Sequence, residues 1–198
     1  SSQGKGLLLS SISDESNSKV VVIGCGEVGK ASIDKAIQIG ASVVAIDLNN
    51  ETLTELKNKY EDKITTIIGG SEEAKMAVRS ADLVLGAVLL PGRKPPVVIM
   101  EEDIDQMEKG TVIIDVAIDQ GGCVENVKPN THSEPFEIRN GVIVSAIANL
   151  PGAVPKTSSI ELSTILQNYI DDLLIEDWFE KYKSNPNLRP SLQIHNGM

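Results

Sequence analysis

The chain has 198 residues, of which 41% are hydrophobic and 23% are charged, and its formal net charge is -10. This length and composition are typical of a globular protein with one substantial core, and no apolar run reaches the roughly 20 residues that span a bilayer. The negative charge disfavours nucleic-acid binding, which needs a basic surface. Two distant cysteines, Cys25 and Cys123, predict neither a disulfide framework nor a metal cluster, and we expect a reduced, cytoplasmic compartment.

Residues 1–18 are rich in serine and glycine, and we interpret them as a lead-in segment. Strands and helices are then expected to alternate. Apolar, β-branched runs predict strands over 19–23, 43–47, 64–68, 82–86, 111–115 and 142–146. Apolar residues at helical spacing predict helices over 27–39, 50–60, 71–80 and 101–107. This alternation predicts an α/β fold with a doubly wound parallel sheet and helices on both of its faces.

A glycine motif joins the first predicted strand to the first predicted helix. Gly24, Gly26 and Gly29 form G-x-G-x-x-G, in which they would allow a tight turn, the approach of a pyrophosphate, and close helix packing, respectively. Asp47 ends the second strand, where it can accept hydrogen bonds from ribose hydroxyls and would repel the 2′-phosphate of NADP. The pattern predicts a Rossmann-type sheet that binds NAD. The alternative is an ordinary strand–helix turn whose glycines serve only packing.

Three unusual loops follow later strands, at 86–92, 115–122 and 148–155. In open α/β sheets, ligands bind beyond the carboxyl ends of the strands, so these loops are candidates for function. Asp119 in the second loop is either a catalytic group or a loop cap that accepts backbone hydrogen bonds. We interpret Asp115, at the end of its strand, as structural.

The pattern changes near the C-terminus. An apolar stripe at helical spacing runs from 157 to about 175 and needs a partner surface, and a shorter helix is predicted over 176–183. We therefore divide the chain into a lead-in segment over 1–18, a dinucleotide-binding domain over 19–156, and C-terminal helices over 157–198.

These loops resemble those of the alanine dehydrogenase family, which is related to the NAD-binding part of proton-translocating transhydrogenase. The matching segments are 22–29, 81–92, 115–123, 131–135 and 148–157. The sequence Asp-Val-Ala-Ile-Asp-Gln-Gly-Gly-Cys over 115–123 is the most specific, because transhydrogenase-like members typically lack the aspartate that matches Asp119. Thr52 and Gly70 depart from the family pattern, which often has Lys or Arg and Ser there, and this could weaken adenosine binding.

The resemblance implies a reaction and a set of residues. The reaction is the reversible, NAD-dependent oxidation of L-alanine to pyruvate and ammonia, with Asp119 as the active-site aspartate that orients or polarises the reacting water, ammonia or imine. No metal is implied. The implied cofactor-binding residues are Gly24, Gly26, Glu27, Val28, Gly29, Asp47, Leu48, Val88, Leu89, Ile118, Asp119, Asn149 and Leu150.

The resemblance also implies a partner. In the family, Arg, Lys and His of an N-terminal domain handle the substrate, and this chain starts after that domain, at Ser1. We expect a fragment that binds NAD but does not oxidise alanine alone, with the helices over 157–198 joining or packing on the absent substrate domain, in a homo-oligomer. Two alternatives remain: the NAD(H)-binding domain of a transhydrogenase, and a non-catalytic NAD-binding or interaction module that docks a partner through its long helix.

Overall fold

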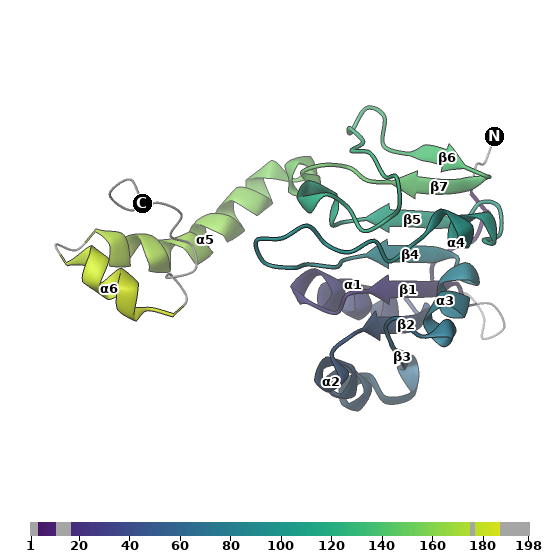
Figure 1. Ribbon diagram of the computed structural model, residues 1–198, viewed down its shortest axis with the longest axis horizontal. Helices are drawn as coiled ribbons and strands as arrows, with labels where there is room; N and C mark the ends of the chain where they lie inside the picture. Colours follow the sequence, from purple (N-terminus) through teal and green to yellow (C-terminus); the bar gives the residue numbers. More distant parts are fainter. Residues whose placement is uncertain (1–3, 11–16, 175–176, 187–198) are drawn as a thin grey trace. The chain divides into compact units, whose positions relative to one another are not determined.

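The computed structural model describes residues 4–10, 17–174 and 177–186 (Figure 1). Part of the predicted lead-in segment, the predicted junction between the C-terminal helices at 175–176, and the tail over 187–198 lie outside the described residues. The chain forms two compact units, Ser1–Leu150 and Pro151–Met198. Each unit is described by itself.

The first unit is built on a seven-stranded sheet in the order β3-β2-β1-β4-β5-β7-β6. The strands are β1 Lys19–Ile23, β2 Ser42–Asp47, β3 Ile64–Ile68, β4 Leu83–Gly86, β5 Val112–Asp115, β6 Glu137–Arg139 and β7 Val142–Ser145. The six predicted strands are present and run parallel to one another. The short edge strand β6 was not predicted, and it runs antiparallel to β7.

The predicted helices of this unit are also present. They are α1 Glu27–Gln38, α2 Asn50–Tyr60, α3 Glu72–Arg79 and α4 Glu101–Asp105, with short 3-10 turns η1 Glu61–Lys63, η2 Ile118–Gln120 and η3 Leu150–Ala153, the last of which continues beyond the unit. Their ends follow local chemistry. The Asn49 side chain caps α2 by accepting from the Glu51 N–H, and Ser71 caps α3 by accepting from the Ala74 N–H. Gly40, with φ of +84°, follows the end of α1.

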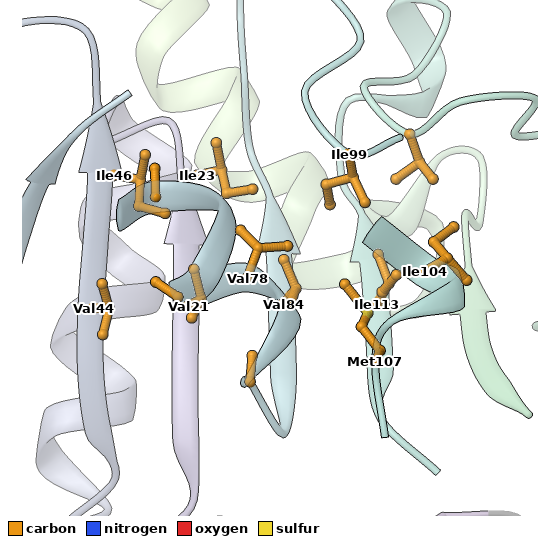
Figure 2. Close-up of a cluster of buried hydrophobic side chains, with 14 of the residues drawn as sticks. Val21, Ile23, Val44, Ile46, Val78, Val84, Ile99, Ile104, Met107 and Ile113 are labelled. Carbon is orange, nitrogen blue, oxygen red and sulfur yellow. The ribbon is translucent and has the colours of Figure 1, made fainter. Parts of the chain in front are cut away.

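The sheet buries both faces, because successive strand residues point to opposite sides. On β1, Val21 and Ile23 face a core with α3 and α4, whereas Val20 and Val22 face a second core with α1 and α2. Figure 2 shows the first core, where Val78 of α3 lies above the central strands. The predicted class, a Rossmann-type doubly wound sheet, is confirmed.

The described part of the lead-in segment is anchored. The Lys5 ammonium lies 2.9 Å from the carboxylates of both Asp82 and Glu108, and the Ser18 hydroxyl donates to the Leu8 carbonyl at 2.6 Å. A cavity of about 290 Å³ lies between this segment and strands β4 and β5.

The second unit contains α5 Pro155–Leu173 and α6 Trp178–Ser184. The long helix starts two residues before the predicted position because Pro155 occupies the first helical turn, where its missing N–H costs nothing. Among the side chains of this helix that the structure describes, the exposed apolar ones are Ile160, Leu162, Ile165, Leu166, Tyr169 and Ile170. In the part of the chain that the structure describes, no helix is long and apolar enough to cross a membrane.

Candidate functional site

The parallel strands end at one edge of the sheet, and the order reverses between β1 and β4 (Figure 1). Ligands of doubly wound sheets bind at this switch point because the loops on either side diverge there. The glycine turn follows β1, Asp47 ends β2, and the three loops noted in the sequence follow β4, β5 and β7. All the predicted site residues therefore lie on the carboxyl-end side of the sheet.

The three glycines of the motif have separate structural reasons. Gly24 has φ of +89°, and a Cβ there would lie 2.6 Å from the Ala87 carbonyl oxygen. A Cβ on Gly29 would overlap the Gly24 carbonyl oxygen and lie 3.0 Å from its carbon. The missing side chain of Gly29 therefore lets the backbone of the glycine turn pack against α1. The nearest atoms belong to the turn at Gly24, and the strand side chain of Val22 lies farther away, at 3.6 Å. A Cβ on Gly26 would meet no atom within 4 Å, so its missing side chain leaves open space at the helix start.

The N-terminus of α1 is suited to an anion. Gly26 is the N-cap, and no side chain among the described residues caps this helix. Its first N–H groups and the positive end of the helix dipole are thus directed to the open space beside the turn. Glu27 and Val28 form the first exposed helical positions. Because the chain is strongly negative, a pyrophosphate would be held here by local amides rather than by the overall field.

Asp47 makes two backbone contacts that the sequence did not predict. One carboxylate oxygen accepts from the Cys25 N–H at 2.6 Å, and the other accepts from the Asn49 N–H at 2.8 Å. The side chain therefore fixes the glycine turn from the adjacent strand. It remains partly exposed, and each oxygen keeps acceptor capacity for a hydroxyl. Leu48, which follows it, is 78% exposed.

The loop after β4 packs on the glycine turn. A Cβ on Gly24 would lie 2.9 Å from the Val88 nitrogen, so Val88 borders the turn directly. Leu89 is 59% exposed. The loop then reverses, with the Arg93 N–H donating to the Leu90 carbonyl at 3.1 Å. Apolar side chains are thus presented beside the open space at the switch point.

The loops after β5 and β7 meet at Asp119. Its two carboxylate oxygens accept from the Asn149 N–H at 3.1 and 3.2 Å, and Asn149 has φ of +52°. Both residues are exposed, and Leu150 is partly exposed. The contact is the backbone hydrogen bond expected of a loop cap, but it leaves the carboxylate accessible at the ligand edge. Ile118 is buried.

The two cysteines lie under these loops and are unsuited to nucleophilic chemistry. Burial, and then the charge of Asp47, raise the pKa of the Cys25 thiol to about 12. Burial, and then the Asp115 carboxylate, raise the pKa of the Cys123 thiol. Both thiols are therefore protonated at neutral pH.

The predicted residues form two groups. The first joins the glycine turn, Asp47 and Val88, and the second joins Asp119 and Asn149. Leu48 and Leu89 are largely exposed. Among the described residues, no group of His, Cys, Asp and Glu is placed to hold a metal ion.

Comparison with known proteins identifies the family. The family model "Alanine dehydrogenase/PNT, C-terminal domain" matches residues 1–198. The alanine dehydrogenase of Bacillus subtilis (strain 168) is 41% identical over 195 residues, which are 98% of this chain and 52% of the relative. A solved L-alanine dehydrogenase superposes with a TM-score of 0.88 at 34% identity, over 99% of this chain and 54% of that chain. The transhydrogenase of Sinorhizobium meliloti has a TM-score of 0.74 at 20% identity, over 92% of this chain and 52% of that chain, and so shares the fold.

The chain thus spans about half the length of the curated relatives it matches, 52% in the Bacillus subtilis case. The resemblance stated from the loops is confirmed, because the family model covers every residue. This chain belongs to the alanine dehydrogenase/PNT C-terminal domain family.

Proposed function

We propose that this chain is the NAD(H)-binding half of an L-alanine dehydrogenase, which interconverts L-alanine with pyruvate and ammonia. One observation carries the proposal: the uncapped N-terminus of α1 and the Asp47 carboxylate lie together at the switch point, in a chain whose relatives are alanine dehydrogenases. Amides at a helix start favour phosphate, and a carboxylate on the next strand favours ribose hydroxyls. The residues present therefore fit a dinucleotide.

The first group of residues would hold the adenosine end. The glycine turn and the first turn of α1, with Glu27 and Val28, would contact the pyrophosphate, and Leu48 would lie beside the adenosine. Asp47 would accept from a ribose hydroxyl while keeping its bonds to the Cys25 and Asn49 N–H groups, because each oxygen has more than one lone pair.

The second group would hold the nicotinamide end. When bound, the nicotinamide ring exchanges a hydride with the substrate carbon. Val88, Leu89, the Ile118 backbone and the 149–150 segment would fix the position of that ring over β4 and β5. Asp119 would polarise the reacting water, ammonia or imine. The groups that bind the substrate carboxylate and act as base would come from the region that the relatives have beyond the matched half.

Cofactor binding is tested by calorimetric titration of the 198-residue chain with NADH and with NADPH. We expect NADH to bind more tightly, because Asp47 would face the 2′-phosphate of NADPH as a like charge. No heat from either ligand, with the chain folded, would contradict the proposal. Equal or tighter NADPH binding would contradict the part assigned to Asp47.

Catalysis is tested by NADH formation with L-alanine. We expect negligible turnover by this chain alone. In the intact protein, Asp119→Asn should lower turnover by about 100-fold or more, the usual worth of a positioned acid/base or charge-stabilising group, with little change in NADH affinity. Asp105→Asn, at the end of α4 and away from the carboxyl edge, is the matched control. If Asp119 is only a loop cap, its variant will melt at a lower temperature with full turnover per folded molecule.

Two alternatives give different results. A transhydrogenase domain would bind NAD(H) without alanine oxidation in the intact protein, and its support is a fold likeness at 20% identity. A non-catalytic module would bind NAD(H) or a partner with no turnover in any context. We also expect the intact protein to form homo-oligomers, which light scattering would measure.

A further inference from the structure

We propose that Asp115 is a positioning residue: its buried carboxylate, together with the Cys123 thiol, fixes the two loops that would hold the nicotinamide end of the cofactor. This inference rests on the proposed NAD(H)-binding function. Asp115 is the last residue of β5 and is fully buried, so it cannot touch a ligand itself.

The contacts of Asp115 close the loop that carries Asp119. One oxygen accepts from the Ala117 N–H at 3.0 Å, and the other accepts from the N–H groups of Cys123 and Val124 at 2.8 and 3.1 Å. These donors belong to the first and last parts of the loop, with Asp119 between them. This side chain therefore joins the two ends of the loop from which Asp119 reaches the Asn149 N–H, in addition to the backbone hydrogen bonds within the loop, such as that from the Gly122 N–H to the Ala117 carbonyl at 3.1 Å.

The loop packs closely around the Asp115 carboxylate. Gly122 has φ of +76°, and a Cβ there would lie 3.0 Å from the Asp115 oxygen and overlap the Val127 side chain. The positive φ and the close contacts with Val127 and Asp115 together require glycine at this position.

The Cys123 thiol extends this control to the neighbouring loop. Its sulfur lies 3.4 Å from the first Asp115 oxygen, to which the protonated thiol donates. A Cβ on Gly86, the last residue of β4, would overlap this sulfur, so the thiol packs directly against the start of the loop after β4. Asp115 is thereby connected through one side chain to the loop after β4, whose Val88 borders the glycine turn.

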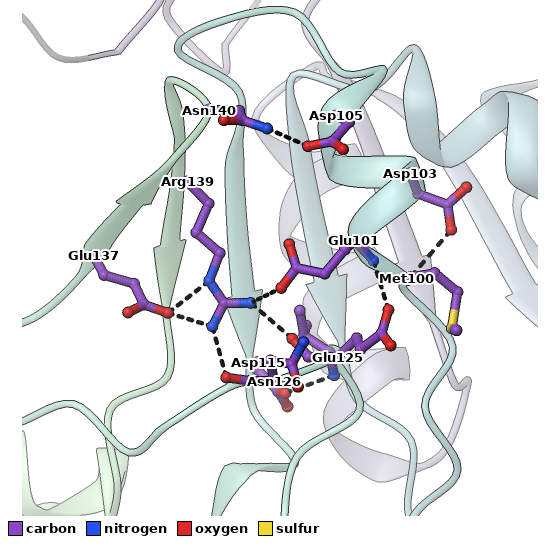
Figure 3. Close-up of polar contacts among 11 residues, drawn as sticks. Met100, Glu101, Asp103, Asp105, Asp115, Glu125, Asn126, Glu137, Arg139 and Asn140 are labelled. Atoms are coloured by element: carbon purple, nitrogen blue, oxygen red, sulfur yellow. Dashed lines mark hydrogen bonds and ion pairs between the residues drawn. The ribbon is translucent and has the colours of Figure 1, made fainter.

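The far end of the loop is fixed separately by Arg139 on β6, as Figure 3 shows. Its guanidinium donates to the Glu125 carbonyl at 2.7 Å and the Asn126 carbonyl at 3.0 Å, and it pairs with Glu101 at 2.9 Å. Since Arg139 already anchors the chain beyond Val124, Asp115 specifically controls the segment between 116 and 124.

The test uses Asp115→Asn, which keeps the shape of the side chain. Every hydrogen-bonding partner of the carboxylate is a donor. An asparagine amide can accept through its oxygen only, so in either orientation its NH2 group would face N–H or S–H donors and those hydrogen bonds would be lost. The matched control is Asp103→Asn. Asp103 is also buried, accepts the Met100 N–H at 3.1 Å and pairs with Arg79, but it lies on α4 and its carboxylate bonds to neither of these loops.

The readout is the affinity of the folded chain for NADH and for ADP-ribose, which lacks only the nicotinamide. We expect Asp115→Asn to lower the affinity for NADH by about tenfold, which corresponds to about 1.4 kcal/mol, and to change the affinity for ADP-ribose by less than twofold. Asp103→Asn should leave both affinities unchanged, although it lowers the melting temperature. The proposal would be overturned if Asp115→Asn lowered the affinities for both ligands equally, or lowered neither. If the unmodified chain binds neither ligand, the proposed function itself fails.

A second pair of variants covers the case in which Asp115→Asn does not fold. Cys123→Ala removes the thiol that donates to Asp115 and the sulfur that packs against Gly86, whereas Cys123→Ser retains a hydroxyl that can donate to Asp115. We expect Cys123→Ala to lower the ratio of NADH to ADP-ribose affinity and Cys123→Ser to restore most of it. The same ratio in both variants and the unmodified chain would overturn the role of the pair.

Discussion

Gly29→Ala should destabilise the first unit even in the absence of any ligand. The added Cβ would overlap the Gly24 carbonyl oxygen and lie 3.0 Å from its carbon, well inside the 3.5–4.0 Å at which carbon atoms pack, so α1 must move away from the turn. Overpacking of this kind costs about 1–3 kcal/mol and sometimes more. Replacing a helical glycine by alanine otherwise gains about 1 kcal/mol. Because the clash is with backbone that cannot rotate away, we expect a cost of about 3 kcal/mol, at the upper end of that range, and a net loss of about 2 kcal/mol.

For a unit of 150 residues, this loss lowers the melting temperature by roughly 4–8 °C. Far-UV circular dichroism is the suitable probe, because the single tryptophan, Trp178, lies in the second unit. Gly26→Ala is the matched control. Its Cβ enters open space, so it should cost less than about 1 kcal/mol of stability but weaken NADH binding by about tenfold or more, since it occupies the space assigned to the pyrophosphate. A Gly29→Ala chain that melts with the unmodified one would refute this reasoning.

Three further predictions rest on single contacts. Asp47→Ala should lower the affinity for NADH and bring it closer to the affinity for NADPH in calorimetric titrations. If the ratio of the two affinities does not change, Asp47 does not select the cofactor. Cys25 and Cys123 should be inert to Ellman's reagent at pH 8 in the native chain and react in urea, because both are buried and have raised pKa values; fast native reaction would contradict the packing. Burial lowers the pKa of Lys5, but the hydrogen bonds and charges of Asp82 and Glu108 outweigh burial and raise this pKa above its ordinary value of 10.5. The stabilisation that the Lys5 ammonium contributes is therefore fully present below pH 10.5 and is lost as the pH rises through the raised pKa. In urea unfolding, Lys5→Met should reduce the stability of the chain more at pH 8 than at pH 12.

The sequence predicted the parts of the fold that depend on local pattern. Six strands and four helices of the first unit were expected within about two residues, because buried parallel strands are continuously apolar and helices carry caps such as Ser71. Strand β6 was missed for a physical reason. Its three residues, Glu137 to Arg139, alternate polar and apolar over too short a run, and its position depends on Arg139 reaching Glu101 and the 125–126 carbonyls. Contacts of that range leave no periodic signal in the chain.

The same limit applies to the site. The glycine motif predicted the turn and the close packing of the helix at Gly29. The structure adds that the group against which Gly29 packs is the Gly24 carbonyl. The hydrogen bond from the Cys25 N–H to Asp47 and the one from the Asn149 N–H to Asp119 join residues 22 and 30 positions apart, and neither has a sequence signature. These contacts follow only from the strand order, which brings the ends of separate strands to one edge.

These hydrogen bonds also change what the choice between a structural and a functional aspartate means. Asp47 and Asp119 each accept backbone N–H groups and still present acceptor capacity at the ligand edge, so each is able to serve both roles at once. Asp115 accepts comparable bonds but is fully buried, so any effect it has on a ligand must pass through the loop. A fall in melting temperature therefore does not separate the three residues. Measurements on the cofactor are expected to separate them. We expect the Asp47 variant to lose affinity through the ribose, the Asp115 variant to lose affinity through the nicotinamide, and the Asp119 variant to lose turnover without a change in affinity.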